Sequence, residues 1–251
     1  MRKDVLASGR NSKHRRLTCR GSWQLADGSP DTGPSACQID PGIIRLGRMC
    51  LAVHERTFQM TVPNSDGLRE RLATTRFPRA SSYDPHWLID NWMGPHVLWL
   101  AEWLAERLDL RPGMRVLDLG CGRAVSSIFL TKEFGVSVWA VDLWIKPSQN
   151  TERIEQAGVS RQVFPILAEA HNLPFAEGYF DAIVSVDAYH YFGTDDLHLG
   201  YIATFLRPGG QLGIVTPCVL DELADLPPPH LSPYWVWDFC SFHSPAWWRR
   251  H

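Results

Sequence analysis

Short apolar runs that alternate with amphipathic segments place the strongest limit on how this 251-residue chain folds. The runs are "RVLD", "VSVWAVD", "QVFPIL", "FDAIVSV" and "QLGIV", between residues 115 and 215. Such runs are typical of strands that are buried on both faces, with the intervening helices covering those faces. The order predicts an α/β fold with a doubly wound, mostly parallel sheet, in which ligands bind beyond the carboxyl ends of the strands.

Four segments with helical periodicity predict the helices of this fold. They span residues 94–108, 124–134, 151–157 and 195–206. Pro95 is expected in the first turn of the first helix, where proline is favoured, and Gly135 is expected to end the second. Near the C-terminus, Ser244 and Pro245 form a helix-start signal in which the serine is the cap.

The first 60 residues show weak periodicity and many Arg, Ser, Gly and Pro residues. We expect a disordered or irregular extension over residues 1–60, because such a sequence buries little apolar surface. Two alternatives remain open: translation could start at Met60, or the segment could be an Arg-rich transit peptide. Scattered Asp residues and the lack of an amphipathic stripe disfavour the transit peptide.

Charge divides the chain into two unlike parts. Residues 1–80 hold 14 Lys and Arg against 7 Asp and Glu, a net charge of +7, whereas residues 81–251 hold 11 against 20, a net charge of −9. Binding to phosphate backbones rests on cationic contacts, so we expect no nucleic-acid partner for this acidic body.

The six cysteines have neither the spacing of a zinc module nor the density of a disulfide scaffold. This usage predicts reduced thiols, no metal and a cytoplasmic location. No apolar run approaches the length of a membrane span, so no membrane partner is expected either.

The first apolar run ends in "DLGCGRA", which predicts a tight turn into a helix. Gly120 and Gly122 lack side chains, so a ligand can approach the backbone, and the helix start offers free N–H groups. Asp142 ends the next run, 24 residues after Asp118, where an acid can hold both ribose hydroxyls. A nicotinamide-dependent oxidoreductase is disfavoured, because its G-x-G-x-x-G fingerprint needs a glycine where Val125 stands.

Five segments resemble, in the expected order, the class I S-adenosylmethionine-dependent methyltransferases. They are "DLGCGRA", "AVDLW", "AEAHNLPF", "FDAIVSVDAYHYF" and "LRPGGQLGIV", and the resemblance covers residues 83–248. It is nearest to the small-molecule, cyclopropane-synthase-like members. The resemblance implies a Rossmann-like fold, S-adenosylmethionine as cofactor, a methyltransferase core over residues 111–251 and a helical lid over residues 61–110.

The resemblance also implies which residues hold the methionine part of the cofactor. Asp118 and the backbone of the glycine turn are expected to cradle it, and Asp187 is expected to line the same end. The turn residues are Gly120, Cys121 and Gly122. Asp118 has an alternative role as a cap on the turn.

The nucleoside part is assigned in the same way. Asp142 is expected to hold the ribose, and Leu143 to pack on the adenine, with ordinary core packing as the alternative for the leucine. Glu169 is expected to accept a hydrogen bond from the adenine amino group, beside the Ala170 backbone. His171 is a further candidate for the adenine contact, beside this pair.

Methyl transfer from a sulfonium chiefly needs alignment of the reactants and exclusion of water. His190 is the candidate base for an acceptor that must lose a proton, because it directly follows the fourth apolar run and titrates near neutral pH. The favoured alternative is that His190 is a packed or hydrogen-bonded pocket residue. Aromatic residues near the same edge predict a small apolar or aromatic acceptor; they are Tyr83, Trp87, Trp92, Tyr189, Tyr191, Trp235 and Trp237.

The C-terminus departs from the family pattern. The family continues the helix that starts at Pro245 and adds two more strands, whereas this sequence ends at His251. We therefore expect a sheet without the last strand pair, an exposed edge that permits oligomerisation, and a chain that is truncated or completed by a partner. An inactive or fragmentary S-adenosylmethionine-binding protein is the alternative to an active methyltransferase.

Overall fold

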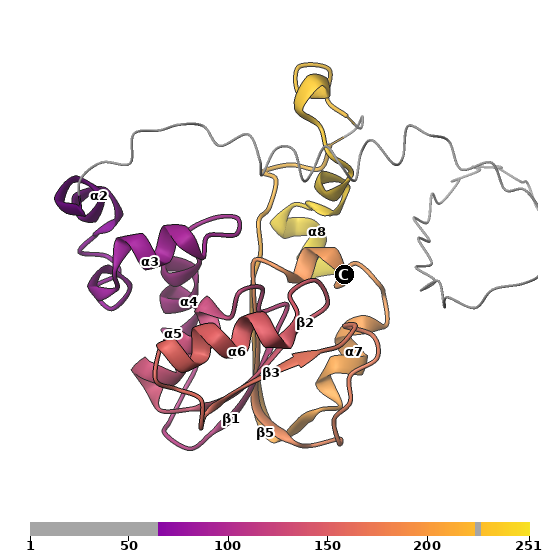
Figure 1. Cartoon of the computed structure of the whole chain (residues 1–251). Coiled ribbons are helices and arrows are strands. Elements are labelled where there is room, and N and C mark those ends of the chain that lie inside the picture. Colours follow the sequence, from indigo (N-terminus) through magenta and orange to yellow (C-terminus); the bar gives the residue numbers. More distant parts are fainter. Residues whose placement is uncertain (1–64, 224–226) are drawn as a thin grey trace, which may run out of the picture. The chain divides into compact units, whose positions relative to one another are not determined.

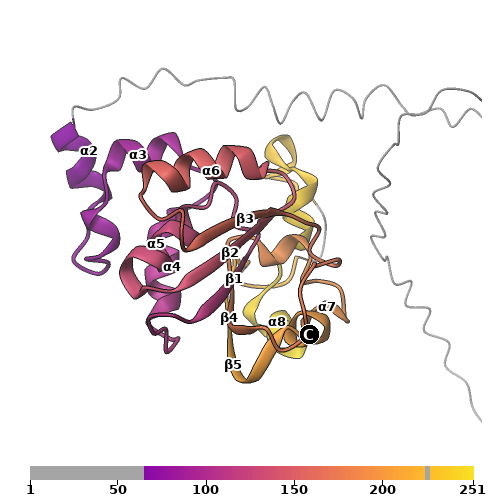
Figure 2. The same cartoon turned by 60° about the horizontal axis from the view of Figure 1, so that its bottom comes forward.

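The computed structural model describes residues 65–223 and 227–251. The expected extension over residues 1–60 lies outside the described residues. Within them, five parallel strands form one sheet in the order β3-β2-β1-β4-β5 (Figures 1 and 2). The strands are β1 (Arg115–Leu119), β2 (Ser137–Asp142), β3 (Val163–Leu167), β4 (Phe180–Val186) and β5 (Leu206–Val215). The predicted α/β fold with a doubly wound parallel sheet is confirmed.

Helices cover both faces of this sheet. On one face lie α4 (Val97–Ala105), α5 (Val125–Phe134) and α6 (Pro147–Gln156), and on the other lies α7 (His198–Ala203) (Figure 2). The side chains of successive residues in a strand point to opposite faces of the sheet, as the pleat requires. Val116 packs with α4 and α5, whereas the next residue, Leu117, packs with Ile202 of α7.

Short elements precede and follow this core. Before it lie α2 (Ser65–Leu72), the 3-10 helix η1 (Ala80–Ser82) and α3 (Pro85–Asp90). After β4 and β5 come the 3-10 helices η2 (Tyr189–Tyr191), η3 (Ser232–Tyr234) and η4 (Trp237–Ser241), and then α8 (Pro245–Arg250). The predicted cap of α8 is confirmed, because Ser244 Oγ accepts a hydrogen bond from the Trp247 amide at 3.2 Å.

Three predicted helix starts are wrong, and the simplest case is the fourth helix, α7, which begins at His198 rather than at residue 195. The first predicted helix begins at Val97 rather than in the turn that holds Pro95, because His96 is its cap and accepts a hydrogen bond from the Trp99 amide. The third begins at Pro147, four residues before the predicted Thr151. There the Gln149 side chain accepts from the Lys146 amide, a local bond that the search for apolar periodicity overlooks.

The last strand is also longer than predicted. β5 begins at Leu206 and includes the segment "RPGG", which the sequence indicates as a turn. Phe180 pairs with Leu206, but Ala182 pairs with Gln211, so the four residues 207–210 form an irregularity at the start of the strand. The remaining pairs, up to Val186 with Val215, are regular.

Among the described residues, no helix is both long enough and apolar enough to cross a membrane.

Candidate active site

Most of the predicted site residues gather where β1, β2, β3 and β4 end. The parallel register places Leu119, Asp142, Leu167 and Val186 at one edge of the sheet. From β1 the strand order runs through β2 to β3 in one direction, and β4 and β5 lie on the opposite side of β1. The order therefore reverses between β1 and β4, which flank a topological switch point. Ligands of open α/β sheets bind at such a point.

The glycine turn that follows β1 is attached to the end of β2. The amides of Gly120 and Cys121 both donate to the Val141 carbonyl, at 2.9 and 3.0 Å. Gly120, Gly122 and Ala124 have φ values of 76°, 52° and 57°, in the left-handed region. For Ala124 this conformation is strained, and such strain is concentrated at functional sites.

Protein atoms fill the space that side chains on the two glycines would need. A Cβ on Gly120 would overlap the Cβ of Ala188, and a Cβ on Gly122 would lie 3.2 Å from Met93 Sδ. The missing side chains therefore let the loop after β4 and the segment before α4 approach the turn. This is a structural role that the sequence interpretation, centred on a ligand, did not include.

Asp142 connects the glycine turn to the loop after β2. Its Oδ2 accepts from the Gly122 amide at 2.8 Å, and its Oδ1 accepts from the amides of Trp144 and Ile145 at 2.7 and 2.9 Å. A carboxylate offers about four lone-pair positions. One position is left for a ribose hydroxyl, and a second hydroxyl can be accepted if it replaces the Gly122 amide.

Asp118 is fully buried beneath the turn. Its Oδ2 accepts from the hydroxyls of Ser126 and Ser127 at 2.6 and 2.7 Å, which ties the end of β1 to the first turn of α5. Burial raises the pKa of Asp118 to about 6, and the two serine hydrogen bonds act against this rise. Its buried Oδ1 has no hydrogen-bond partner among the described residues.

Cys121 contributes backbone rather than thiol chemistry. Its side chain is buried, and burial raises the pKa of the thiol well above its usual range. The thiol therefore stays protonated at neutral pH and is no nucleophile. Asn150 of α6 donates to the neighbouring Gly122 carbonyl at 2.9 Å and so fixes the turn from the other side.

The end of β4 carries two titratable groups. Asp187 adopts a left-handed φ of 57°, and burial raises its pKa to about 6. His190 is 2% exposed, its Nδ1 lies 3.0 Å from Thr216 Oγ1, and burial lowers its pKa to about 4. His190 also packs against Tyr191 and Phe242. His190 is therefore a packed and hydrogen-bonded residue, as the alternative to a catalytic base predicted.

At the other end of the site, Leu143 is 53% exposed. The alternative of ordinary core packing is therefore wrong for this leucine. Glu169 and Ala170 follow β3. The Glu169 carboxylate accepts from the backbone and the ring of His171, and the Ala170 carbonyl accepts from His198.

A sequence profile of the methyltransferase domain matches residues 116–210, which include the glycine turn, Asp142, Glu169 and the end of β4. Residues 116–210 form a methyltransferase domain. The five-stranded sheet and its helices have the Rossmann-like fold of the class I S-adenosylmethionine-dependent enzymes, as the sequence resemblance implied.

The similar proteins include methyltransferases of several kinds. The methyltransferase GfsG of Streptomyces halstedii is 32% identical over 132 residues, which are 51% of this chain and 46% of that protein. A demethylmenaquinone methyltransferase of Corynebacterium efficiens is 33% identical over 114 residues, 43% and 44% of the two chains. A solved geranyl diphosphate methyltransferase in complex with S-adenosylmethionine shares 27% identity and a TM-score of 0.51, over 60% of each chain. The match spans less than half the length of the two curated relatives.

The residues of the methyltransferase domain fit a sulfonium nucleoside. The buried Asp118 Oδ1 without a partner and the Asp142 carboxylate provide negative charge at one edge of the sheet. The amide of Ala170 makes no hydrogen bond among the described residues, and its side chain lies at the same edge. These charges suit a cationic ligand, and the Ala170 amide with the Glu169 carboxylate suits a base that presents both an acceptor and a donor.

The structure adds residues that the sequence analysis missed. Trp144 is 63% exposed and its ring lies 5.2 Å from that of Tyr191, so it extends from the loop after β2 to the loop after β4. Met93 lies against Gly122, as described above, and Arg123 donates to the Asp90 carbonyl at 2.7 Å. The signal in the sequence for Trp144 is its place two residues after Asp142, the acid expected to hold the ribose.

Several aromatic residues expected in a pocket wall serve packing instead. Tyr83 packs on Phe129 of α5, with ring centroids 5.6 Å apart. Tyr189 is buried and packs on Trp248 of α8 at 5.8 Å. The side chain of Trp237 lies outside the described residues. A surface hollow of about 510 Å³ beside α4 is lined by Arg76, Arg79 and neighbouring residues, and none of the predicted site residues borders it.

Proposed function

We propose that this chain transfers a methyl group from S-adenosylmethionine to a small, apolar or aromatic organic acceptor. The observation that carries the proposal is the junction of the glycine turn with Asp142, in which the Gly122 amide donates to Asp142 Oδ2 at 2.8 Å. It joins the two features that the family resemblance assigns to the cofactor, inside the matched methyltransferase domain.

The proposed cofactor contacts follow the geometry of this edge. The turn from Gly120 to Gly122 holds the methionine part, Asp118 supports the turn from beneath through Ser126 and Ser127, and Asp187 lines the same end. Asp142 accepts from the ribose, and Leu143 covers the adenine. Glu169 accepts from the adenine amino group, beside the free amide of Ala170.

When bound, S-adenosylmethionine supplies a methyl group on a positively charged sulfur that is already an activated leaving group. The residues of this chain align the acceptor and exclude water, and such alignment is worth about 7–11 kcal/mol in well-oriented systems. The segment that contains Met93 and Gly94 supports a lid role for residues 61–110. Met93 lies against Gly122, and Gly94 lies against Asp187.

Proton removal from the acceptor is proposed for His190, which is neutral at neutral pH because burial lowers its pKa to about 4. That low pKa makes His190 a weak base. Asp187, with its pKa raised to about 6, is the stronger proton acceptor at the same strand end. Both residues are therefore included in the test.

The acceptor class rests on the exposed rings near this edge. Trp144 and Tyr191 lie edge to face, with ring centroids 5.2 Å apart. Among the relatives, the names demethylmenaquinone methyltransferase and geranyl diphosphate methyltransferase indicate acceptors with large apolar parts. We extend that chemistry to this chain as part of the proposal.

The proposal places the protein in the cytoplasm, with free thiols at Cys121, Cys218 and Cys240. It includes the edge of β5 as a surface through which copies of the chain could pair, because β5 is the last strand of the sheet in the described part of the chain.

A second candidate function is cofactor binding without turnover. The observation that favours it is the cover over His190, where the Phe242 ring lies 5.0 Å away and the histidine is almost fully buried. An acceptor that needs this base would have to displace Phe242.

The two functions differ in one experiment. The protein is incubated with S-adenosylmethionine labelled in the methyl group and a panel of quinols, phenols and prenyl compounds. Thermal unfolding is followed in parallel with S-adenosylmethionine, S-adenosylhomocysteine and NAD. We expect stabilisation by the first two ligands and label transfer that falls at least tenfold in Asp187→Asn or His190→Gln. Stabilisation without transfer favours the second function, and stabilisation by NAD alone contradicts both.

A further inference from the structure

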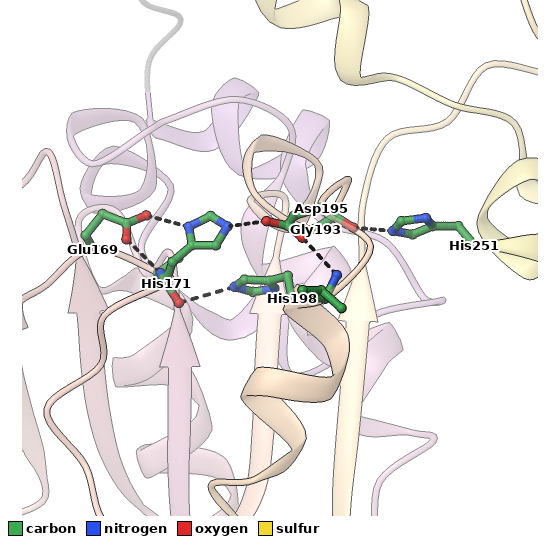
Figure 3. Close-up of polar contacts among 8 residues, drawn as sticks. Glu169, His171, Gly193, Asp195, His198 and His251 are labelled. Atoms are coloured by element: carbon green, nitrogen blue, oxygen red, sulfur yellow. Dashed lines mark hydrogen bonds and ion pairs between the residues drawn. The ribbon is translucent and has the colours of Figure 1, made fainter. Parts of the chain in front are cut away.

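Two histidines fasten the segment that the proposed function assigns to the adenine. Glu169 to His171 follow β3, the loop before α7 supplies Asp195, and His198 is the first residue of α7 (Figure 3). The two histidine rings meet edge to face, with centroids 4.8 Å apart. The resemblance placed His171 beside the adenine contacts, and it gave His198 no role.

His171 holds the Glu169 carboxylate at both oxygens. The His171 amide donates to Oε2 at 2.8 Å, and ring Nδ1 lies 2.7 Å from Oε1. Because a carboxylate only accepts, Nδ1 carries the proton in this bond. On its other side the ring faces a second carboxylate, with Nε2 3.8 Å from Asp195 Oδ2. The Glu169 carboxylate is therefore held by two hydrogen bonds from His171.

His198 holds the next residue along the segment. It is 1% exposed, and its Nε2 donates to the Ala170 carbonyl at 3.2 Å. Its Nδ1 is buried without a hydrogen-bond partner among the described residues, which matches a neutral ring protonated on Nε2. Burial lowers the pKa of His198, in agreement with a neutral ring. The bond to the carbonyl restricts the backbone of Ala170, and with it the direction of the Ala170 amide.

The Glu169 carboxylate keeps the capacity to bind a ligand. Its side chain is 47% exposed, and two donors from His171 leave about two of its four lone-pair positions free. An amino group can therefore donate to it while both His171 bonds persist.

We propose that His171 and His198 form a positioning clamp that holds the Glu169 carboxylate and the Ala170 amide as an acceptor and donor pair for the adenine edge. The inference rests on the proposed function, and it concerns how the chain selects adenine over other bases. Adenine presents an amino donor beside a ring-nitrogen acceptor. Hypoxanthine presents a carbonyl oxygen in place of the amino group, which a fixed carboxylate repels.

The test compares two ligands by calorimetric titration: S-adenosylhomocysteine and its hypoxanthine analogue, S-inosylhomocysteine. The full chain should bind the first more tightly. His171→Ala should reduce this preference by about 3- to 10-fold, the loss expected for one net hydrogen bond. His171→Asn, whose amide nitrogen can replace ring Nδ1, should retain most of the preference, whereas His171→Gln should lose it.

A matched control uses the second histidine–glutamate pair of the chain. His243 Nδ1 lies 3.0 Å from Glu222 Oε2, away from the adenine segment, so His243→Ala should leave the preference unchanged. Glu169→Gln should remove the preference altogether, and circular dichroism of each variant checks its folding.

The outcomes separate the clamp from the function on which it rests. If Glu169→Gln removes the preference but His171→Ala retains it in full, the clamp is overturned and the adenine contact stands. If Glu169→Gln has no effect, the adenine assignment and the clamp both fail. If the parent chain binds neither ligand, the proposed function itself is contradicted.

Discussion

At the residue scale, some of the positions with a left-handed backbone also join elements. Gly120 allows Ala188 to pack where a side chain would otherwise lie, and Asp187, next to Ala188, has a left-handed φ. The loop after β4 therefore touches the turn after β1 through close backbone approach rather than through long side chains. A change of a single methyl group at this junction should affect both folding and ligand binding.

Gly120→Ala is the direct test of that junction. The new methyl group would overlap Ala188 Cβ, and the φ of 76° adds strain, so we expect a loss of about 2–4 kcal/mol in the free energy of unfolding. Gly178 has a φ of 67°, but a methyl group added there would meet no atom within 4 Å, which makes Gly178→Ala the matched control. It should lose only about 1 kcal/mol. Equal losses of unfolding free energy in the two variants, measured by urea unfolding, would show that the overlap with Ala188 does not affect stability.

The burial of His190 makes a second prediction at this scale, on the dependence of stability on pH. Its pKa falls from an ordinary 6.5 to about 4 in the folded state, so the unfolded chain binds more protons between these values. The contribution of this residue is therefore fully present above pH 6.5 and is lost as the pH falls toward 4. In His190→Gln, which lacks this group, the drop in unfolding free energy from pH 6.5 to 4 should be smaller by about 2–3 kcal/mol.

Chemical unfolding of both proteins at half-unit pH steps measures this difference. Asp118 and Asp187, whose pKa values are raised to about 6, act in the opposite direction in both proteins and cancel in the comparison. Parallel pH curves for parent and variant would show that His190 is not held neutral by burial.

At the element scale, a buried carboxylate joins the segment before the core to α4. Glu102 is 5% exposed and accepts from the amides of Arg79 and Ala80, at 3.2 and 2.7 Å. These bonds hold η1 against α4, and α4 is the helix whose preceding segment reaches the glycine turn. Glu106, one helical turn later, binds Arg76 at the surface instead.

Glu102→Ala should therefore destabilise the fold by about 2–4 kcal/mol, because it leaves two amides without an acceptor in a buried place. Glu106→Ala removes an exposed ion pair and should change the unfolding free energy little. Urea unfolding of the two variants measures the contrast. A larger loss for Glu106→Ala would mean that η1 is held mainly by the surface pair.

The helices also show what the sequence could and could not predict. Strand positions follow from their apolar runs, because burial on both faces leaves little choice of residue. The start of α4 at Val97 and of α6 at Pro147 depends on single bonds, from Trp99 to His96 and from Lys146 to Gln149. Apolar periodicity does not register such bonds, so these two starts were predicted incorrectly.

At the scale of the whole molecule, the sequence predicted the sheet and the gathering of the candidate site residues, since the ends of parallel strands share an edge. It could not predict which residues from distant segments would enter that place. Met93 lies against Gly122, Trp144 meets Tyr191, and Phe242 covers His190. Each contact joins two loops whose paths depend on packing over the whole fold, and no local pattern encodes it.

The turn after β1 and the carboxylate at the end of β2 are central to the proposed function, as one site for a sulfonium nucleoside. Calorimetric titration of S-adenosylhomocysteine into the parent chain and into Asp142→Ala tests this most directly, with Asp109→Ala, an exposed acid before β1, as the control. We predict binding to the parent and to the control, and an affinity about 10- to 100-fold weaker in Asp142→Ala, the loss expected for hydrogen bonds to a charged acceptor. Equal affinity in all three proteins, or no binding to the parent, would contradict it.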